Sequence, residues 1–163
     1  MFRDMRRKKQ LLSDEESYRI LRNATNGVLA LSGDDDYPYA VPISYVYHDG
    51  HIYMHSAVKG HKIDAINRNE KVSFCVVEKD EIVSEEFTTY FRSVIAFGKA
   101  RLVEDANEKI DILRILAAKY SPKETEESVA HEIDKSILHI NVIDITIEHV
   151  TGKESIELVR MRK

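Results

Sequence analysis

The chain has 163 residues, of which 43% are hydrophobic and 32% charged, a balance typical of one globular domain. Its formal net charge of −4 argues against general nucleic-acid binding, and no apolar run approaches the ~20 residues that a membrane span needs. The single cysteine, Cys75, excludes an internal disulfide and a thiolate cluster for zinc or an iron–sulfur centre.

The first ten residues are basic but contain no apolar segment, so they do not form a secretory signal. A mitochondrial presequence would be richer in serine and would avoid Asp4. We therefore expect a cytoplasmic protein with a single domain over residues 1–163, a solvated basic arm at 1–11 and a C-terminal tail at 154–163.

A helix is expected over residues 13–24, because Ser13 and Glu16 have the spacing of a capping box. Residues 27–31 then form a short apolar run, which predicts a buried strand. The Gly- and Asp-rich residues 32–36 predict a turn.

Residues 37–47 are rich in aromatic and β-branched side chains and predict a strand. Pro38 and Pro42 each remove a hydrogen-bond donor, so this strand belongs at an edge, at a bulge or in the gap of a barrel. A hairpin turn at 48–50 leads into a returning strand at 51–56.

A short helix is expected over 59–69 and a strand over 71–77, followed by an acidic stretch, 78–86, that predicts an exposed loop. A long strand follows at 90–104. One face of it carries small side chains that would let another backbone or a flat ligand come close. They are Val94, Ala96, Gly98 and Ala100.

Residues 105–120 carry an apolar stripe typical of a helix, and the polar segment 121–135 is expected to be partly helical. The last strand, 138–150, changes phase between Val142 and Ile143, which predicts a β-bulge. Because no regular alternation of strands and helices appears, we expect a mainly β fold, an antiparallel barrel with peripheral helices.

Several kinds of active site are absent from the sequence. The glycines match neither the dinucleotide fingerprint nor a nucleotide phosphate loop, and no nucleophile elbow of a hydrolase occurs. His51 and His55 share a strand face, but ~13 Å of strand separates them, which is too far to chelate one ion. We therefore expect no metal site.

The stretch from His55 to Lys62 is the most informative for function, because Lys59, His61 and Lys62 crowd the first turn of the expected helix. Cations are disfavoured there by the helix dipole. A bound phosphate would remove the conflict, held by backbone N–H groups, the Ser56 hydroxyl and a lysine. An ordinary solvated turn, at a cost of only ~0.3–1 kcal/mol, explains the residues equally well.

Taken in order, these segments resemble the pyridoxamine-phosphate-oxidase-like flavoproteins and, within them, the nitroimidazole-resistance (nitroreductase-like) branch. The likeness spans about residues 12–153. It is carried by Tyr37-Pro-Tyr-Ala-Val-Pro-Ile-Ser-Tyr45, Ile52-Tyr-Met-His-Ser-Ala57, Gly60-His-Lys62, Val72-Ser-Phe74, Arg92-Ser-Val-Ile-Ala-Phe-Gly-Lys99 and Thr151-Gly-Lys153.

The resemblance implies a split β-barrel homodimer that binds FMN at the subunit interface, with one site per subunit. Along the isoalloxazine it would place Val41, Pro42, Ile43 and Ser44. At the flavin edge and phosphate tail it would place His55, Ser56, Ala57 and Lys62. Toward the flavin of the partner subunit it would place Arg92 and Ser93. The oxidase itself has a Trp-Arg-Leu-x-Pro ending, which this chain lacks, so oxidation of pyridoxine phosphate is not expected.

By this resemblance we expect an FMN-dependent oxidoreductase that passes electrons from a reduced nicotinamide to a small planar acceptor such as a nitroaromatic. His55 is the catalytic candidate, as a hydrogen-bond or proton donor, although a phosphate or structural contact accounts for this residue somewhat better than proton transfer does. One rival hypothesis is a non-enzymatic module that stores or senses flavin, or holds haem through an axial ligand facing an open pocket. Another is a cofactor-free interaction domain, against which the Lys-rich helix start counts.

Overall fold

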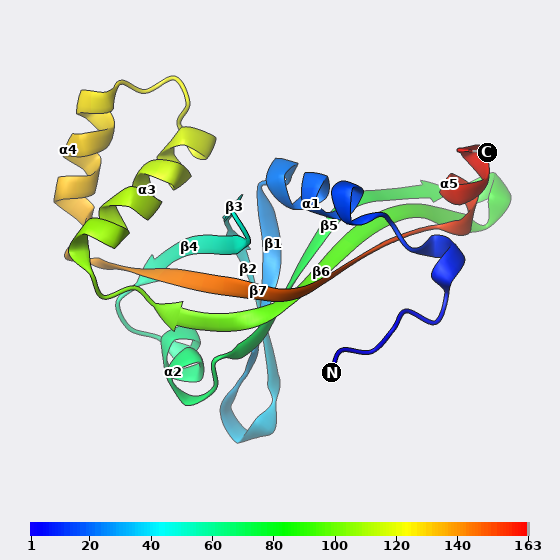
Figure 1. The fold of residues 1–163 in the computed structure, drawn as a ribbon, viewed down its shortest axis with the longest axis horizontal. Helices are drawn as coiled ribbons and strands as arrows, with labels where there is room; N and C mark the ends of the chain where they lie inside the picture. Colours follow the sequence, from blue (N-terminus) through cyan, green and yellow to red (C-terminus); the bar gives the residue numbers. More distant parts are fainter. Residues whose placement is uncertain (163) are drawn as a thin grey trace.

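The computed structural model describes residues 1–162, in which strands dominate and helices lie at the periphery (Figure 1). The strands are β1 (Asn26–Ser32), β2 (Pro38–Ser44), β3 (Val46–His48), β4 (His51–Ala57), β5 (Lys71–Val83), β6 (Thr88–Leu102) and β7 (Ile140–Glu154). The α-helices are α1 (Asp14–Asn23), α2 (His61–Arg68), α3 (Ala106–Tyr120), α4 (Glu126–Ser136) and α5 (Ile156–Met161). Three short 3-10 helices are η1 (Lys8–Gln10), η2 (Asp34–Asp36) and η3 (Ser84–Glu86).

All seven strands form one antiparallel sheet in the order β2-β1-β5-β6-β7-β4-β3. Its two edge strands, β2 and β3, are consecutive in the chain and are separated only by Tyr45. The sheet therefore curls into a barrel that is split between β2 and β3. The expected antiparallel split barrel is confirmed, and so is the edge position of the strand with two prolines.

Two hydrophobic cores lie on opposite faces of the β7 region. Ile143 and Ile145 belong to the main core inside the barrel, whereas Val142 belongs to a second core beneath α3 and α4. The predicted bulge between Val142 and Ile143 is therefore wrong, because both faces of the strand are buried there and its pairing with β4 is unbroken. The register shift in β7 lies further on, at Glu148. Phe97 of β6 pairs with His149 and Gly98 pairs with Ile147, so Glu148 has no partner residue in β6.

The helices begin where the sequence supplies caps. Ser13 Oγ accepts a hydrogen bond from the backbone N–H of Glu16 at the start of α1, and the Asp105 carboxylate caps α3 in the same way. The polar segment 121–135 is partly helical as expected, because Thr125 caps α4. Helices α3 and α4 form a hairpin that stands over one end of the sheet (Figure 1).

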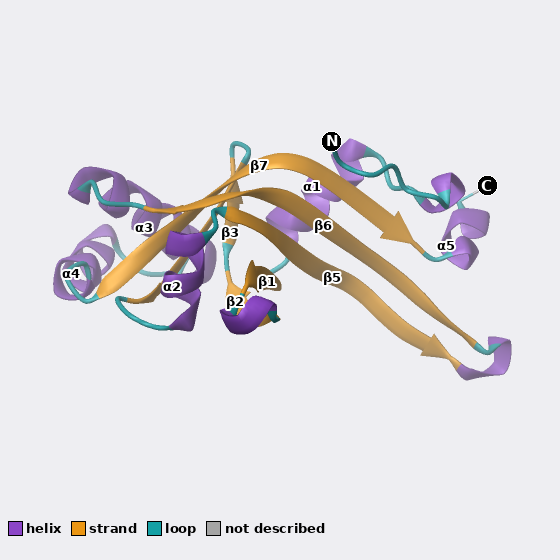
Figure 2. Cartoon of the chain, turned by 90° about the horizontal axis from the view of Figure 1, so that it is seen from below, coloured by secondary structure: helices purple, strands orange, loops and turns teal. Residues whose placement is uncertain are grey.

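The acidic stretch 78–86 is not the expected loop. β5 continues to Val83 and pairs with β6 up to that residue, with Glu81 opposite Tyr90 and a register shift at Glu78. Strands β5, β6 and β7 run together as a long ribbon away from the barrel (Figure 2). Charged side chains are tolerated in β5 because much of this ribbon is open to solvent, and Ile82 is 77% exposed.

The small side chains of β6 admit a neighbouring backbone rather than a ligand. A Cβ at Gly98 would collide with the carbonyl oxygen of Thr146 in β7. Ala96 and Ala100 are buried in the main core. The close approach that the sequence predicted is thus part of the sheet itself.

Both ends of the chain pack on the ribbon. Leu11 pairs with Lys153 as an isolated bridge, and the buried Gln10 side chain donates to the carbonyl oxygen of Glu154. Much of the segment that the sequence suggested as a tail forms helix α5. None of the helices within residues 1–162 combines the length and apolar character that crossing a bilayer takes.

Candidate functional site

A small pocket of about 160 Å³ lies where β4 ends and α2 begins. It is lined by Tyr39, Ser56, Ala57, Lys59, Gly60, His61, Lys62 and Ile63. Three of these side chains are basic and none is acidic. The pocket therefore has the charge that the sequence suggested for an anion site.

The start of α2 leaves backbone donors free in this pocket. Gly60 is its N-terminal cap with φ 141°, a left-handed conformation that favours glycine, and a Cβ there would meet open space. The N–H groups of His61 and Lys62 lie in the first turn, where a helix offers no internal acceptor. Two backbone donors and the positive end of the helix dipole thus converge on one point.

Lys62 is the more buried of the two lysines that line the pocket. Its side chain is half-buried, and none of the salt bridges formed among residues 1–162 involves it. Burial without a counter-charge lowers the pKa of the Lys62 ammonium. A phosphate group would supply the missing negative charge.

His61 is held in place by Tyr39, which also lines the pocket, and by Asp34, which does not. Its ring stacks on Tyr39 with 4.1 Å between centroids, and Nε2 accepts from the backbone N–H of Asp34 at 3.3 Å. Asp34 is fixed in turn by Arg68 at 2.8 Å. His61 is therefore a fixed wall of the pocket, and Lys59 and Lys62 are the basic lining residues with no ion-pair partner within residues 1–162.

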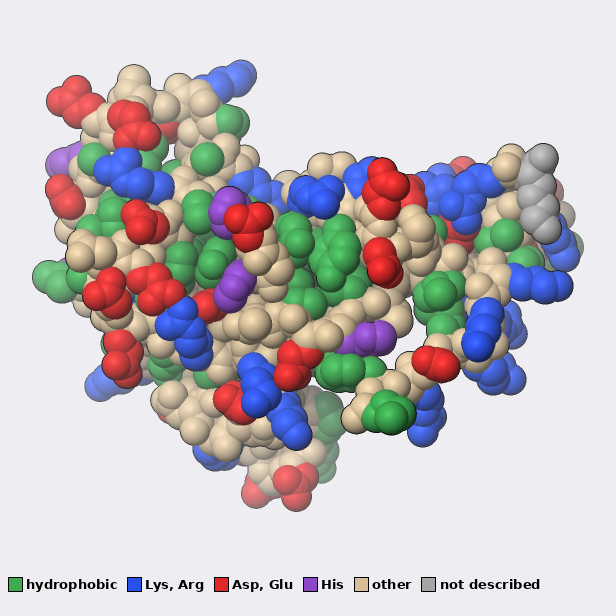
Figure 3. Space-filling model, in the orientation of Figure 1, with side chains coloured by type: hydrophobic (Ala, Val, Ile, Leu, Met, Phe, Trp, Pro, Cys, Tyr) green, Lys and Arg blue, Asp and Glu red, His purple; other side chains and the backbone are tan. Residues whose placement is uncertain are grey.

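A larger cavity of about 800 Å³ lies between the α3–α4 hairpin and the ends of β2, β4 and β7. It is lined by Ser44, His55, Leu113, Leu116, Ala117, Tyr120, Ser121, Glu124, Ser128, Val129, His131, Glu132, Ile133, Ser136 and Ile140. Its floor is apolar and its charged lining residues are acidic. Figure 3 shows several acidic side chains over α4, with Lys or Arg side chains between them.

The end of β4 is the wall between the two pockets. Successive side chains of a strand point to opposite faces, so His55 faces the larger cavity and Ser56 the small pocket. β2 also touches both, because Tyr39 lines the small pocket and Ser44 the larger cavity. The segment from Val41 to Ser44 therefore runs from one pocket to the other.

Helix α3 closes the split of the barrel beside this segment. The backbone N–H of Tyr45 donates to the Tyr120 hydroxyl at 2.9 Å, and that hydroxyl lies 2.6 Å from the Tyr45 carbonyl oxygen. The Lys119 ammonium donates to the same carbonyl at 3.1 Å and to that of Ala24. These bonds satisfy backbone groups that no strand pairs, and burial lowers the pKa of Lys119.

Five of the ten residues suggested as flavin contacts line one or the other of the two pockets, and three more lie on β2 without lining either. Val41 and Ile43 pack partly against the main core, whereas Pro42 and Ser44 are exposed on β2. Ser44 and His55 line the larger cavity. Ser56, Ala57 and Lys62 line the small pocket.

Arg92 and Ser93 lie elsewhere, on the ribbon. Arg92 Nε is 3.1 Å from the Glu154 carboxylate, which is fully buried and also pairs with Arg162. Within one subunit, Arg92 thus balances a buried charge. Its contact with a flavin of the partner subunit remains a prediction.

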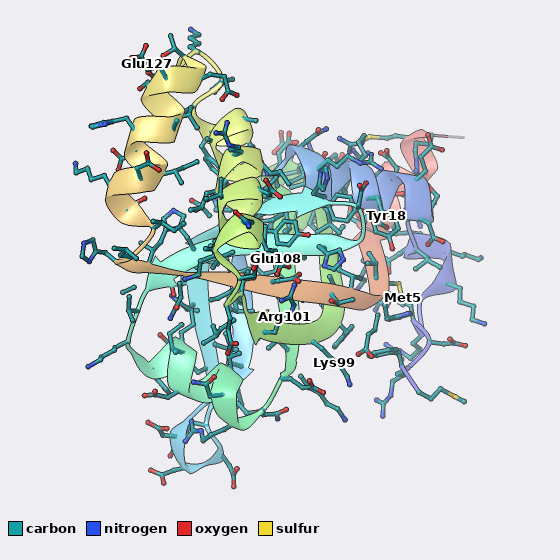
Figure 4. The ribbon with its side chains drawn as sticks, turned by 60° about the vertical axis from the view of Figure 1, so that its left-hand side comes forward. Met5, Tyr18, Lys99, Arg101, Glu108 and Glu127 are labelled. Atoms are coloured by element: carbon teal, nitrogen blue, oxygen red, sulfur yellow. The ribbon has the colours of Figure 1, made fainter. Side chains whose placement is uncertain are left out.

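A second buried carboxylate, Asp144, lies beside the second core. It accepts from His51 Nδ1 at 2.7 Å and from Arg101 Nε at 3.0 Å, and Arg101 also pairs with Glu108 (Figure 4). Every charge in this group has a partner, and neither pocket includes its members. The group is therefore a structural network that ties β4, β6 and β7 to α3.

Sequence reasoning missed the contribution of the α3–α4 hairpin. The signal was present in α4, where Ser128, Glu132 and Ser136 recur every four residues beside the apolar Val129 and Ile133. Such a helix has one apolar and one polar edge. Only the folded structure shows that the apolar and the polar residues of α4 line the same cavity as His55.

Comparison with known proteins identifies a family that matches most of this chain. The family model described as pyridoxamine 5'-phosphate oxidase matches residues 13–154. No curated protein matches the chain.

Solved structures share the fold at low sequence identity. A candidate 5-nitroimidazole antibiotic resistance protein from Bacteroides thetaiotaomicron is 23% identical, with a TM-score of 0.75 over 88% of this chain and 86% of that one. An FAD-binding protein from Mesorhizobium loti is 26% identical, with a TM-score of 0.60 over 90% and 97%. An FAD- and haem-binding protein from Mycobacterium smegmatis is 19% identical, with a TM-score of 0.70 over 91% and 74%.

Proposed function

The chain belongs to the pyridoxamine 5'-phosphate oxidase family, and from this premise we propose that it is an FMN-binding oxidoreductase that reduces a small planar acceptor. The observation that carries the proposal is the small basic pocket beside β2, with the unpaired Lys62 at a helix start. Two of the similar structures described above are proteins that bind FAD. A pocket of this size would hold one phosphate group, such as the terminal phosphate of FMN.

The chain's own residues fit such a cofactor. Lys62 and the first N–H groups of α2 would bind the phosphate. The free edge of β2 would offer backbone groups from Val41 to Ser44 to the ring, because β2 pairs only with β1 within residues 1–162. When bound, the flavin supplies the two-electron redox chemistry.

The overall reaction balances with a reduced nicotinamide as donor. A nitro group, a reduced nicotinamide and one proton give a nitroso group, an oxidised nicotinamide and water. His55 would donate a hydrogen bond or a proton to the acceptor, since its exposed side chain lines the larger cavity.

We also propose a homodimer built on the outer face of the sheet. The pairing of β2, β1, β5 and β6 puts Pro42, Val28, Cys75 and Ile95 in one row on that face. Ile95 is 39% exposed and nearby Val77 61%. Ile95→Glu should convert a dimer of 18.8 kDa chains into monomers in light scattering, and a monomeric parent protein would contradict the proposal.

A haem-binding or flavin-storing module is the second candidate. It is favoured by one observation, that His55 and His131 both line the larger cavity and could offer an axial ligand. A Soret band in the isolated protein would support haem. Bound flavin without turnover would support storage.

Turnover is the direct test of the proposed function. The FMN-loaded protein should oxidise NADH or NADPH only when a nitroaromatic acceptor such as 4-nitrobenzyl alcohol is present, under anaerobic conditions. His55→Ala should lower kcat while leaving FMN bound. A flavin-loaded protein that oxidises neither nicotinamide with any acceptor would contradict the enzyme proposal.

A further inference from the structure

The larger cavity has the size and shape of a small-molecule site. Its volume of about 800 Å³ lies in the range typical of ligand pockets, and facing side chains of two helices and β7 make its apolar floor. These are Leu113, Leu116, Ala117, Val129, Ile133 and Ile140. An apolar floor of this kind favours a ligand with an apolar ring.

The charges of the cavity are one-sided. Glu124 and Glu132 line it, and no lysine or arginine is among its lining residues. Glu124 accepts only from the Ser128 hydroxyl at 3.4 Å, and the Glu132 carboxylate has no hydrogen-bond or ion-pair partner within residues 1–162. Segment 121–136 carries five acidic residues and two lysines, so its field is negative as well.

We propose that this cavity is the acceptor site and that it selects a flat apolar ring carrying a protonated amine. The inference rests on the proposed function and deepens it. Glu124 and Glu132 are exposed, so a cation on the ligand would pair with them through interactions that solvent partly screens, whereas an anion would be repelled by both carboxylates. A neutral ring would gain the apolar floor alone.

Because the two pockets carry opposite charges, each pocket would favour ligands of a different charge. A phosphate is attracted to Lys62 and repelled from the larger cavity. The same field disfavours phosphorylated substrates of the pyridoxine type. His55 lies at the wall between the pockets, where a ring in the cavity and a cofactor on β2 would meet.

Three probes of matched shape test the inference: 4-nitrobenzylamine, 4-nitrobenzyl alcohol and 4-nitrobenzoate, with charges of plus one, zero and minus one at pH 7.5. Isothermal titration calorimetry of the FMN-loaded protein at low salt should rank the amine first and the benzoate last. We expect about fivefold between successive probes, and less in high salt. Equal affinities, the reverse order or no binding of any probe would overturn the inference.

Substitutions of the two glutamates test whether these residues cause the preference for the amine. Glu132→Gln combined with Glu124→Gln should bring the amine to within about twofold of the alcohol. Glu127→Gln, at the tip of α4 and outside the cavity lining (Figure 4), is the matched control and should keep the full preference. An amine preference that survives in the double variant would place the amine elsewhere and would overturn the inference.

The same titrations on protein without FMN separate this inference from the proposed function. A charge order in a protein that takes up no FMN would refute the flavoenzyme and leave the cavity's selectivity standing. Bound FMN and turnover without a charge order would refute only the selectivity. Circular dichroism of each variant confirms that the fold is retained.

Discussion

The two pockets lie on either side of one strand end and have opposite chemistry. The small pocket gathers basic side chains at a helix start, and the larger cavity joins an apolar floor to acidic side chains. His55 and Ser56 are neighbours in the chain, yet they face different pockets because they alternate along β4. One strand can therefore serve two ligands of different charge.

The largest expected effect concerns the small pocket. Lys62→Ala should weaken FMN binding about 50-fold, because it removes a charge-assisted hydrogen bond to the phosphate. Quenching of FMN fluorescence on binding measures the affinity. Lys71→Ala, which lies outside both pockets, should bind FMN like the parent protein, and a Lys62→Ala protein that does so too would remove the phosphate assignment.

Substitution of Arg92 tests whether this residue of the ribbon stabilises the fold, contacts a flavin, or does both. Arg92→Ala should lower the free energy of unfolding by about 2 kcal/mol, because Glu154 stays buried with only Arg162 as its ionic partner. Urea denaturation measures the change, and Arg114→Ala, which removes an exposed pair, should cost less than about 0.5 kcal/mol. A fall in FMN affinity in Arg92→Ala would support the contact with the partner's flavin that the resemblance implies. Unchanged stability would contradict the structural role.

The split of the barrel should respond to Tyr120→Phe. Loss of the hydroxyl leaves the Tyr45 N–H without its acceptor, so unfolding should become easier by about 1.5 kcal/mol. Tyr37→Phe, at a side chain that is 75% exposed, is the control and should be neutral. Thermal unfolding measures the stability of both variants. Equal melting temperatures would show that the hydrogen bond from Tyr45 to Tyr120 of α3 does not stabilise the split of the barrel.

The smallest effect is a pH dependence. Burial lowers the pKa of Lys62, so the protonated form that attracts phosphate is lost at a lower pH than for an ordinary lysine. FMN affinity should therefore fall as pH rises toward that pKa, by about threefold between pH 7.5 and 9.5. Lys62→Arg keeps its charge over this range and should show a flat profile, whereas a parallel fall in both proteins would assign the effect to another group.

Local signals in the sequence predicted what nearby residues determine. Caps at Ser13 and Asp105 mark helix starts, and two prolines mark β2 as an edge strand. The small pocket was foreseeable because most of its lining comes from one continuous stretch, 56–63. Such features depend on few long-range contacts.

The features that were missed depend on packing between distant segments. The acidic stretch 78–86 forms strand up to Val83 because β6 pairs with it, which its own composition disfavours. The phase change at Val142 reflects two cores rather than a bulge. The larger cavity exists only because α3 and α4 fold back over His55, far away in the chain.

The visible spectrum of the freshly purified protein, with chromatography of whatever heat releases, tests the central claim most directly. The account predicts a yellow protein that releases FMN. Released FAD would show that the small pocket does not select the cofactor. A Soret band, or a colourless protein that takes up no FMN, would contradict the assignment of the site.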